Sequence, residues 1–494
     1  MPDAPTPVRP IGGEAPASAA LAGMRVYLDS LGCAKNLVDS EATLGLLRGA
    51  GLHAVGDPEQ ADVVLVNTCG FLEVAREESI ERILELAQLK SYGRARLLGV
   101  LGCLVSRAPD ELANSIPEVD VWLPAGSHGA LCERLGAALT RRGDVAQRRA
   151  SDRSGSGRAP AGAFAGFGER VLLTAPHTSY LKISEGCTNT CSFCSIPLMR
   201  GTQRSRPLAA LVREARALAA RGVRELHLVA QDLTHYGYDL PRRADLLDLV
   251  RALAEVDGIE WMRLLYAHPS HLTRRMIRGL FDVPHLARYL DMPIQHASDP
   301  MLRAMRRPYT QARVRRQVAE LRERVPDITL RTTVIVGFPG ESERDFVTLC
   351  RFVEETAWDR LGIFAYSREP GTPAFALRGR PHTQTVTRRI HELTDLQMHV
   401  AAARNAARVG TRARVLVDAL CVGEGADTLH SRFADGAKAV GRSEAEALDI
   451  DGTVYLHADG DLQPGRFVDA TLVDADAFDL CGRVEAAPAT RPSD

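Results

Sequence analysis

Hydrophobic and polar positions between Met24 and Thr140 alternate between short apolar runs and longer amphipathic stretches. The apolar runs are MRVYLDS, ADVVLVN and ARLLGVLG, and helical patterns such as LVDSEATLGLLRGAG and EVAREESIERILELAQL separate them. Strands that alternate with helices are typical of a parallel sheet with helices on both faces. The pattern therefore predicts a doubly wound α/β domain over residues 24–140.

The same alternation returns in the middle of the chain, over residues 171–405. Its apolar runs are YLKIS, ELHLVAQD, MRLLYA, YLDMPIQ, RTTVIVGF and LGIFAYS, with helical stretches such as LAALVREARALAARG between them. Six β/α units predict a partial version of the eight-unit parallel barrel, with its site at the carboxyl ends of the strands.

The pattern changes again over residues 406–484. Short β-rich runs such as RARVLVD, GTVYLHADG and RFVDATLVD are separated by Gly and Asp, which predicts a small all-β barrel of five strands. The remaining segments carry no periodic pattern. Residues 1–23 and 485–494 are expected to be tails, and residues 141–170, rich in Gly, Ser, Ala and Arg, a linker.

Composition narrows the class of protein. The 494 residues are 45% hydrophobic and 25% charged, and no apolar run is long enough to span a membrane. The start of the chain lacks the pattern of a secretory signal, so we expect a cytoplasmic protein whose ten cysteines are reduced. Cytosolic cysteines that cluster are more often metal ligands or catalytic groups than disulfides. The net charge of −1 excludes an overall basic nucleic-acid binder.

Three cysteines follow the first strand of the central region in the segment EGCTNTCSFCSIP. Cys187, Cys191 and Cys194 have the spacing C-x3-C-x2-C, and the next cysteine is Cys350. Thiolates are the usual ligands of iron–sulfur clusters, and three thiolates on a four-iron cluster leave one iron open to bind a substrate. A structural zinc site is the alternative, although it normally has four ligands in paired spacing. Buried cysteines that act only as small hydrophobes are a second alternative.

A second trio of cysteines repeats with the β/α units of the amino-terminal region. Cys33, Cys69 and Cys103 each come just after a predicted strand, and each is next to a glycine. Successive parallel strands bring their carboxyl ends to one edge of the sheet, so we expect these thiols to converge on a second cluster. The alternative is that each Cys ends its strand as a small buried residue.

The first trio and its β/α setting resemble the radical S-adenosylmethionine superfamily. The resemblance implies that the open iron binds S-adenosylmethionine and that an electron from the cluster cleaves it to a 5′-deoxyadenosyl radical. VIVGFPGE resembles a motif of this superfamily beside the adenine, and two further strand ends are usual cofactor contacts. The side chains that the resemblance places at the cofactor are Gln231, Asp232, Gln295, Gly337, Pro339 and Glu341.

Both trios together resemble the methylthiotransferase family over almost the whole chain. The resemblance implies an amino-terminal domain with an auxiliary 4Fe–4S cluster, a radical core with a second 4Fe–4S cluster, and a carboxyl-terminal TRAM barrel. It also implies a sulfur donor and a reductant such as flavodoxin or ferredoxin. The resemblance further implies two stages, in which one S-adenosylmethionine methylates a sulfur held at the auxiliary cluster and another is cleaved to the radical that takes hydrogen from the substrate.

The choice of substrate depends on one motif and on charge. SLGCAKNLVDSE, from Ser30 to Glu41, is similar to the branch that modifies an aspartate at Cβ in the small-subunit ribosomal protein numbered twelve. From Thr411 to Val484 there are seven basic and fourteen acidic residues, a net charge of −7. Such a barrel would repel tRNA and attract a basic ribosomal protein, unless its acidity only keeps the surface soluble. The alternatives are a tRNA adenosine methylthiotransferase and a non-catalytic iron–sulfur carrier.

Arginines gather between Arg303 and Arg316. Such a run is typical of a solvated helix surface, and a binding face is the alternative.

Overall fold

The computed structural model describes residues 20–140, 164, 167–241, 244–421 and 431–485. The tail over residues 1–19, most of the predicted linker and residues 486–494 lie outside the described residues. The chain divides into two compact units, one up to Val171 and one from Leu172 onward.

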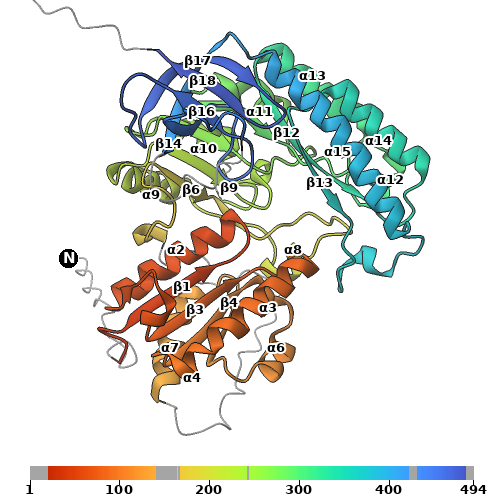
Figure 1. Ribbon diagram of the computed structural model, residues 1–494. Coiled ribbons are helices and arrows are strands. Elements are labelled where there is room, and N and C mark those ends of the chain that lie inside the picture. Colours follow the sequence, from red (N-terminus) through yellow and green to blue (C-terminus); the bar gives the residue numbers. More distant parts are fainter. Residues whose placement is uncertain (1–19, 141–163, 165–166, 242–243, 422–430, 486–494) are drawn as a thin grey trace, which may run out of the picture. The chain divides into compact units, whose positions relative to one another are not determined.

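The first unit is a five-stranded parallel sheet in the order β2-β1-β3-β4-β5, covered on both faces (Figure 1). Along β3, Val64 and Val66 pack against helices α3, α5 and α6, whereas Val63 and Leu65 pack against α2 and α7. This alternation is the period of two expected of a strand buried on both sides. The predicted doubly wound domain is confirmed. Its elements are β1 (Arg25–Ser30), α2 (Ala34–Gly49), β2 (His53–Ala54), β3 (Val63–Thr68), α3 (Glu73–Ala87), β4 (Leu97–Gly102), α5 (Cys103–Arg107), α6 (Pro109–Ser115), β5 (Val121–Pro124) and α7 (Leu131–Thr140).

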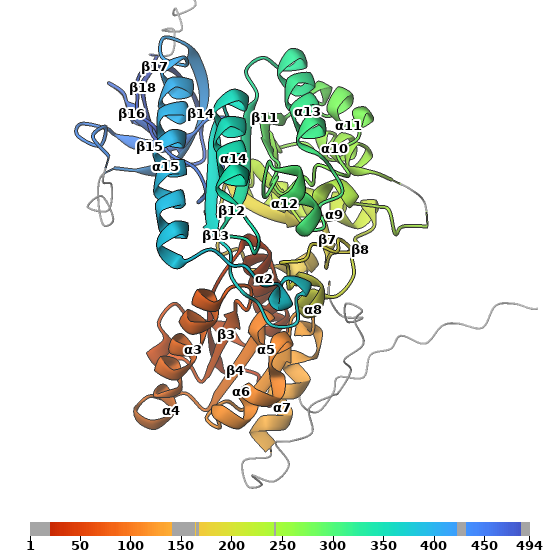
Figure 2. The same ribbon diagram turned by 90° about the vertical axis from the view of Figure 1, so that its right-hand side faces the viewer.

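The second unit contains an open sheet of six parallel strands in the order β13-β12-β11-β10-β9-β6. Helices cover these strands (Figure 2). One large apolar cluster joins the strands to these helices. The parallel sheet of the predicted six-unit domain is confirmed. Its elements are β6 (Thr178–Lys182), α9 (Leu208–Ala220), β9 (Glu225–Val229), α10 (Leu246–Ala254), β10 (Trp261–Leu264), α11 (Arg274–Gly279), β11 (Leu286–Asp291), α12 (Asp299–Ala304), α13 (Gln311–Arg324), β12 (Thr329–Val336), α14 (Glu343–Thr356), β13 (Arg360–Ala365) and α15 (Thr383–Ala406).

A closed five-stranded barrel in the order β14-β15-β16-β18-β17 completes the second unit, as predicted. Its interior is lined by alternate apolar residues such as Val415, Val417 and Leu456. The strands are β14 (Arg412–Leu420), β15 (Ala439–Arg442), β16 (Val454–His457), β17 (Phe467–Ala475) and β18 (Leu480–Val484).

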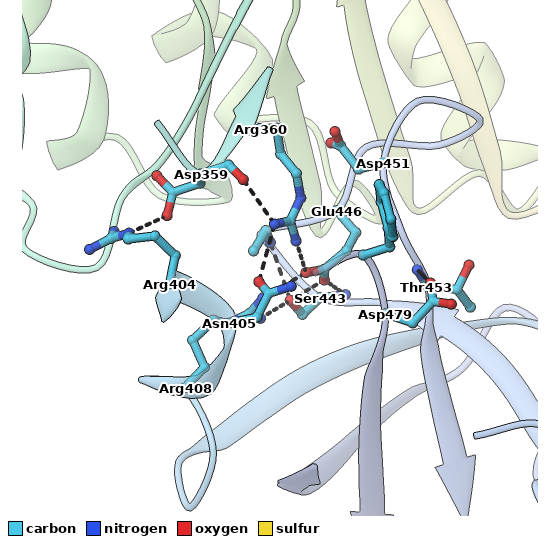
Figure 3. A network of polar contacts seen from close by, with 12 residues as sticks. Asp359, Arg360, Arg404, Asn405, Arg408, Ser443, Glu446, Asp451, Thr453 and Asp479 are labelled. Carbon is cyan, nitrogen blue, oxygen red and sulfur yellow. Dashed lines mark hydrogen bonds and ion pairs between the residues drawn. The ribbon is translucent and has the colours of Figure 1, made fainter. Parts of the chain in front are cut away.

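Buried ion pairs hold this barrel against the amino-terminal ends of the six parallel strands. Glu446 is fully buried and contacts Arg360, at the start of β13, and Arg408, just after α15 (Figure 3). A second pair joins Arg442 of β15 to Glu225, the first residue of β9. Because these groups close the amino-terminal ends of the strands, the carboxyl ends are the ones left for a site. No described helix is both long and apolar enough to cross a membrane.

Candidate active site

The cysteines of the first unit lie at one edge of its sheet. Cys33 follows β1 and precedes α2, Cys69 follows β3, and Cys103 begins α5 directly after β4. These three strands are neighbours, with Ser30 paired to Asn67 and Thr68 paired to Gly102. A Cβ on Gly32 would come within 3.2 Å of Cys69 Sγ, so the loop that carries Cys33 lies directly on Cys69. The structure therefore brings the three loops together, as expected.

A buried asparagine that sequence reasoning missed ties these three loops to one another. Asn36 Nδ2 donates to the carbonyl oxygens of Leu31 and Thr68, each at 2.9 Å. Its Oδ1 lies 3.9 Å from Cys103 Sγ, which donates a weak hydrogen bond to it. One side chain thus contacts the segment before each of two cysteines and the third cysteine itself. In the sequence, only the position of Asn36 three residues after Cys33 could have indicated this role.

The cysteines of the second unit lie on the loop that follows β6 and the short strand β7 (Ser184–Glu185). Burial raises the pKa of Cys187 to about 11 and that of Cys194 to about 12, and the neighbouring Cys191 adds to both effects. Thiols with such pKa values stay protonated at neutral pH unless a metal ion replaces the proton. The backbone N–H of Cys194 donates to the carbonyl oxygen of Cys191 at 3.2 Å, so the loop turns back on itself within the motif.

Arg307 contacts this loop from the far end of α12. It is buried, and its Nη1 donates to Cys191 Sγ at 3.4 Å while its Nε donates to Tyr309 Oη at 2.7 Å. The expectation of a solvated surface is therefore wrong for Arg307. The reason is that α12 ends at Ala304 and the chain turns inward at Arg306, where φ is +54°.

Polar atoms without a protein partner gather at the carboxyl ends of the parallel strands. Buried side-chain atoms of this kind follow four of the six strands among the described residues. They belong to Ser184 after β6, Gln231 after β9, His268 after β10 and Tyr366 after β13. Buried polar groups are normally hydrogen-bonded, so this end of the sheet is suited to a polar ligand.

Three family models match successive parts of the chain. They are the uncharacterized protein family UPF0004 over residues 25–124, the radical SAM superfamily over 181–353 and the TRAM domain over 409–484. The ribosomal protein uS12 methylthiotransferase RimO of Anaeromyxobacter sp. (strain K) is 45% identical over 94% of both chains. RimO of Symbiobacterium thermophilum is 42% identical over 98% of this chain and 94% of that protein.

The chain belongs to the radical S-adenosylmethionine methylthiotransferase family, in the branch named RimO. Among solved structures, the radical S-adenosylmethionine methyltransferase TsrM from Kitasatospora setae matches with a TM-score of 0.55. It is 18% identical and covers 71% of this chain and 75% of its own, a likeness of fold alone.

The residues of the second unit fit the cofactors that membership of the radical S-adenosylmethionine family implies, a 4Fe–4S cluster and S-adenosylmethionine. The donor set is three thiols on one loop with Arg307 beside one of them, and thiolates are the ligands that such clusters use. The polar atoms at the strand ends are of the kind that a polar nucleoside with an amino-acid group would satisfy.

Among the predicted cofactor contacts of this methylthiotransferase, Gln231 is the one whose amide has no partner at either atom within the part of the chain that the structure describes. Asp232 is different, because its carboxylate already accepts hydrogen bonds from Asn189, Thr234 and His271. Although burial raises the pKa of Asp232, the contact with His271 outweighs it and holds that pKa below its usual value. Asp232 therefore holds the cysteine loop through Asn189, and its contact with cofactor stays a prediction.

The remaining predicted contacts lie around the end of β12. Gln295 is half-buried with φ at +65°, and its backbone bridges to β12. Pro339 is buried, and Glu341 accepts from the backbone N–H of Gly337 and contacts Arg389. A Cβ on Gly337 would come within 2.6 Å of Val386 of α15. Packing against that helix thus requires this glycine, whatever the cofactor does.

Proposed function

We propose that this protein transfers a methylthio group to Cβ of an aspartate in ribosomal protein uS12. The observation that carries the proposal is similarity over almost the whole chain to proteins named uS12 methylthiotransferases. Homolysis of an aliphatic C–H bond is beyond acid–base side chains, so the cofactor supplies the chemistry and the protein supplies positioning.

Each trio of cysteines has its own role in this proposal. Cys187, Cys191 and Cys194 hold a 4Fe–4S cluster that supplies the electron for cleavage of S-adenosylmethionine. Cys33, Cys69 and Cys103 hold an auxiliary 4Fe–4S cluster for the sulfur that is methylated. The convergence of three loops at one sheet edge supports the second role. An external reductant, such as flavodoxin or ferredoxin, and a sulfur donor complete the reaction.

The acidic barrel suits a basic ribosomal protein as substrate. Part of the negative charge of the barrel is neutralised within the second unit, because Asp418 and Glu446 form ion pairs with arginines of that unit. The acidic residues on its exposed surface include Asp435, Asp459, Asp461, Asp469 and Asp474. Exposed carboxylates repel phosphates and speed the association of a cationic partner.

Deletion of the gene tests the proposal. Mass spectrometry of uS12 from the deleted strain should show loss of the methylthio mass on the aspartate, and re-expression of the intact chain should restore it. Re-expression of the Cys187→Ala variant should not. Loss of 2-methylthioadenosine from tRNA with unchanged uS12 would favour the tRNA alternative. A carrier without turnover would release no 5′-deoxyadenosine from S-adenosylmethionine when reduced.

Substitution of cysteines separates the two clusters. Cys187→Ala, Cys191→Ala and Cys194→Ala should each abolish 5′-deoxyadenosine formation, because a cluster with two thiolates is lost. Cys33→Ala, Cys69→Ala and Cys103→Ala should leave that reaction intact and block methylthio transfer. Methylthio transfer by any of the latter three variants would contradict the auxiliary cluster. Chromatography measures 5′-deoxyadenosine, and mass spectrometry of uS12 measures methylthio transfer.

A further inference from the structure

His268, just after β10, carries a buried nitrogen that no group of the described residues satisfies. The side chain is 6% exposed, and its Nδ1 accepts a hydrogen bond from the backbone N–H of Ser270 at 3.2 Å. A neutral imidazole has one donor and one acceptor nitrogen, so acceptance at Nδ1 places the proton on Nε2. Burial and the nearby Arg307 hold the pKa of His268 well below its usual value, which keeps the ring neutral. Its Nε2 is a buried donor without a partner among the described residues.

The surroundings of His268 connect it to the cysteine loop on two sides. On one side its ring stacks on His271 with centroids 5.1 Å apart, and His271 Nδ1 lies 2.7 Å from the Asp232 carboxylate. Asp232 accepts in turn from Asn189, which lies between Cys187 and Cys191. On the other side the ring meets Tyr309 edge-on at 5.9 Å, and Tyr309 accepts from Arg307, which donates to Cys191. A group bound at His268 therefore lies beside the loop of the proposed cluster.

The hydrogen-bonding groups at this place favour an anion over a cation. Asp232, His268 and His271 could form a metal trio by distance alone. However, the Asp232 carboxylate already accepts from three side chains and one backbone N–H, and Arg307 is a buried cation nearby. A donor N–H in such a setting is suited to an oxygen that carries negative charge.

We propose that His268 donates a hydrogen bond from Nε2 to a carboxylate of a ligand bound at the carboxyl ends of the strands. The inference rests on the proposed function, which brings two carboxylates to this site. One is the side chain of the uS12 aspartate, and the other belongs to the amino-acid group of S-adenosylmethionine.

The experiment compares two substitutions in the full-length protein with its clusters reconstituted without oxygen. His268→Phe keeps a ring that stacks on His271 but has no donor, whereas His268→Gln keeps an N–H donor near the position of Nε2. His399→Phe, on the exposed face of α15, is the matched control. Affinity for S-adenosylmethionine is measured by equilibrium dialysis with the cluster oxidised, and affinity for labelled uS12 by fluorescence anisotropy. Cluster content is checked by iron counting.

We expect His268→Phe to weaken one of the two affinities by about 10- to 100-fold, the range for a hydrogen bond to a charged group. His268→Gln should restore most of it. If uS12 is the ligand, the effect of His268→Phe disappears when the target aspartate of uS12 is replaced by Ala, which has no side-chain acceptor. If S-adenosylmethionine is the ligand, the affinity of His268→Phe for S-adenosylmethionine falls whether or not uS12 is present.

Two results would overturn the inference. One is that both affinities of His268→Phe equal those of His399→Phe at equal iron content. The other is a non-iron metal ion that the wild-type protein holds and His268→Phe loses. Failure of the proposed function is a separate result. If the wild type neither binds nor modifies uS12, the measurement with S-adenosylmethionine alone still decides the role of His268.

Discussion

Asn36 offers the sharpest test of how the first unit positions its cysteines. Asn36→Ala removes two hydrogen bonds to backbone carbonyls, at Leu31 and Thr68, both 2.9 Å long. Each such bond contributes about 1 kcal/mol, and a buried carbonyl left unpaired adds to the loss. Since the Leu31 end is only partly buried and can reach water, we expect a total of about 2–3 kcal/mol. Asn36→Asp should hold the cluster still less well, because its carboxylate faces two carbonyls and the Cys103 sulfur.

Two assays on the full-length protein measure the loss of stability and the loss of cluster binding. Urea unfolding of the metal-free chain, followed by circular dichroism, should show a midpoint lower by about 1 M for Asn36→Ala. Iron and sulfide are counted in a background where Cys187, Cys191 and Cys194 are all replaced by Ala. There the iron that remains belongs to the proposed auxiliary cluster, and both Asn36 variants should retain less of it.

The control is Asn114→Ala, at an exposed position of α6, which should change stability by less than about 0.5 kcal/mol. The reasoning is refuted if Asn36→Ala matches this control in both urea midpoint and iron content. It is also refuted if Asn36→Asp binds as much iron as the wild type, since charge beside Cys103 would then have no effect.

Two further predictions concern the second unit. Arg307→Met removes the buried cation that donates to Cys191 Sγ, so the reduction potential of the cluster should fall by roughly 60 mV, measured by redox titration followed by electron paramagnetic resonance. An unchanged potential would contradict this contact. Burial raises the pKa of Glu446, but Arg408 and Arg360 outweigh it and hold the pKa at about 2, below the ordinary 4.5. The stabilisation is therefore present above pH 4.5 and is lost as the pH falls towards 2. Glu446→Gln should cost about 3 kcal/mol at pH 7, and the difference from wild type in urea midpoint should shrink at acid pH; a difference independent of pH would refute it.

Local pattern was enough to predict the three folding regions and the two trios of cysteines. A strand buried on both faces is mostly apolar, as β4 and the first four residues of β3 are, and the residue after it lies at the carboxyl edge of the sheet wherever the strand is placed. Cys33, Cys69 and Cys103 could be assigned to one edge for this reason. For Cys187, Cys191 and Cys194, the short spacing within one loop was enough to predict that they act as one group.

Tertiary structure alone decided which other side chains surround the thiols. Arg307 and Cys191 are 116 residues apart in sequence, and 67 residues separate Asn36 from Cys103. Neither contact produces a repeating pattern in the sequence. Each depends on where the loop next to a helix places a polar side chain. The same holds for the buried ion pairs of Glu446 and for the unpaired Nε2 of His268. Hydrophobic periodicity reports which face of an element is buried, whereas a polar contact depends on the partner that packing brings to that face.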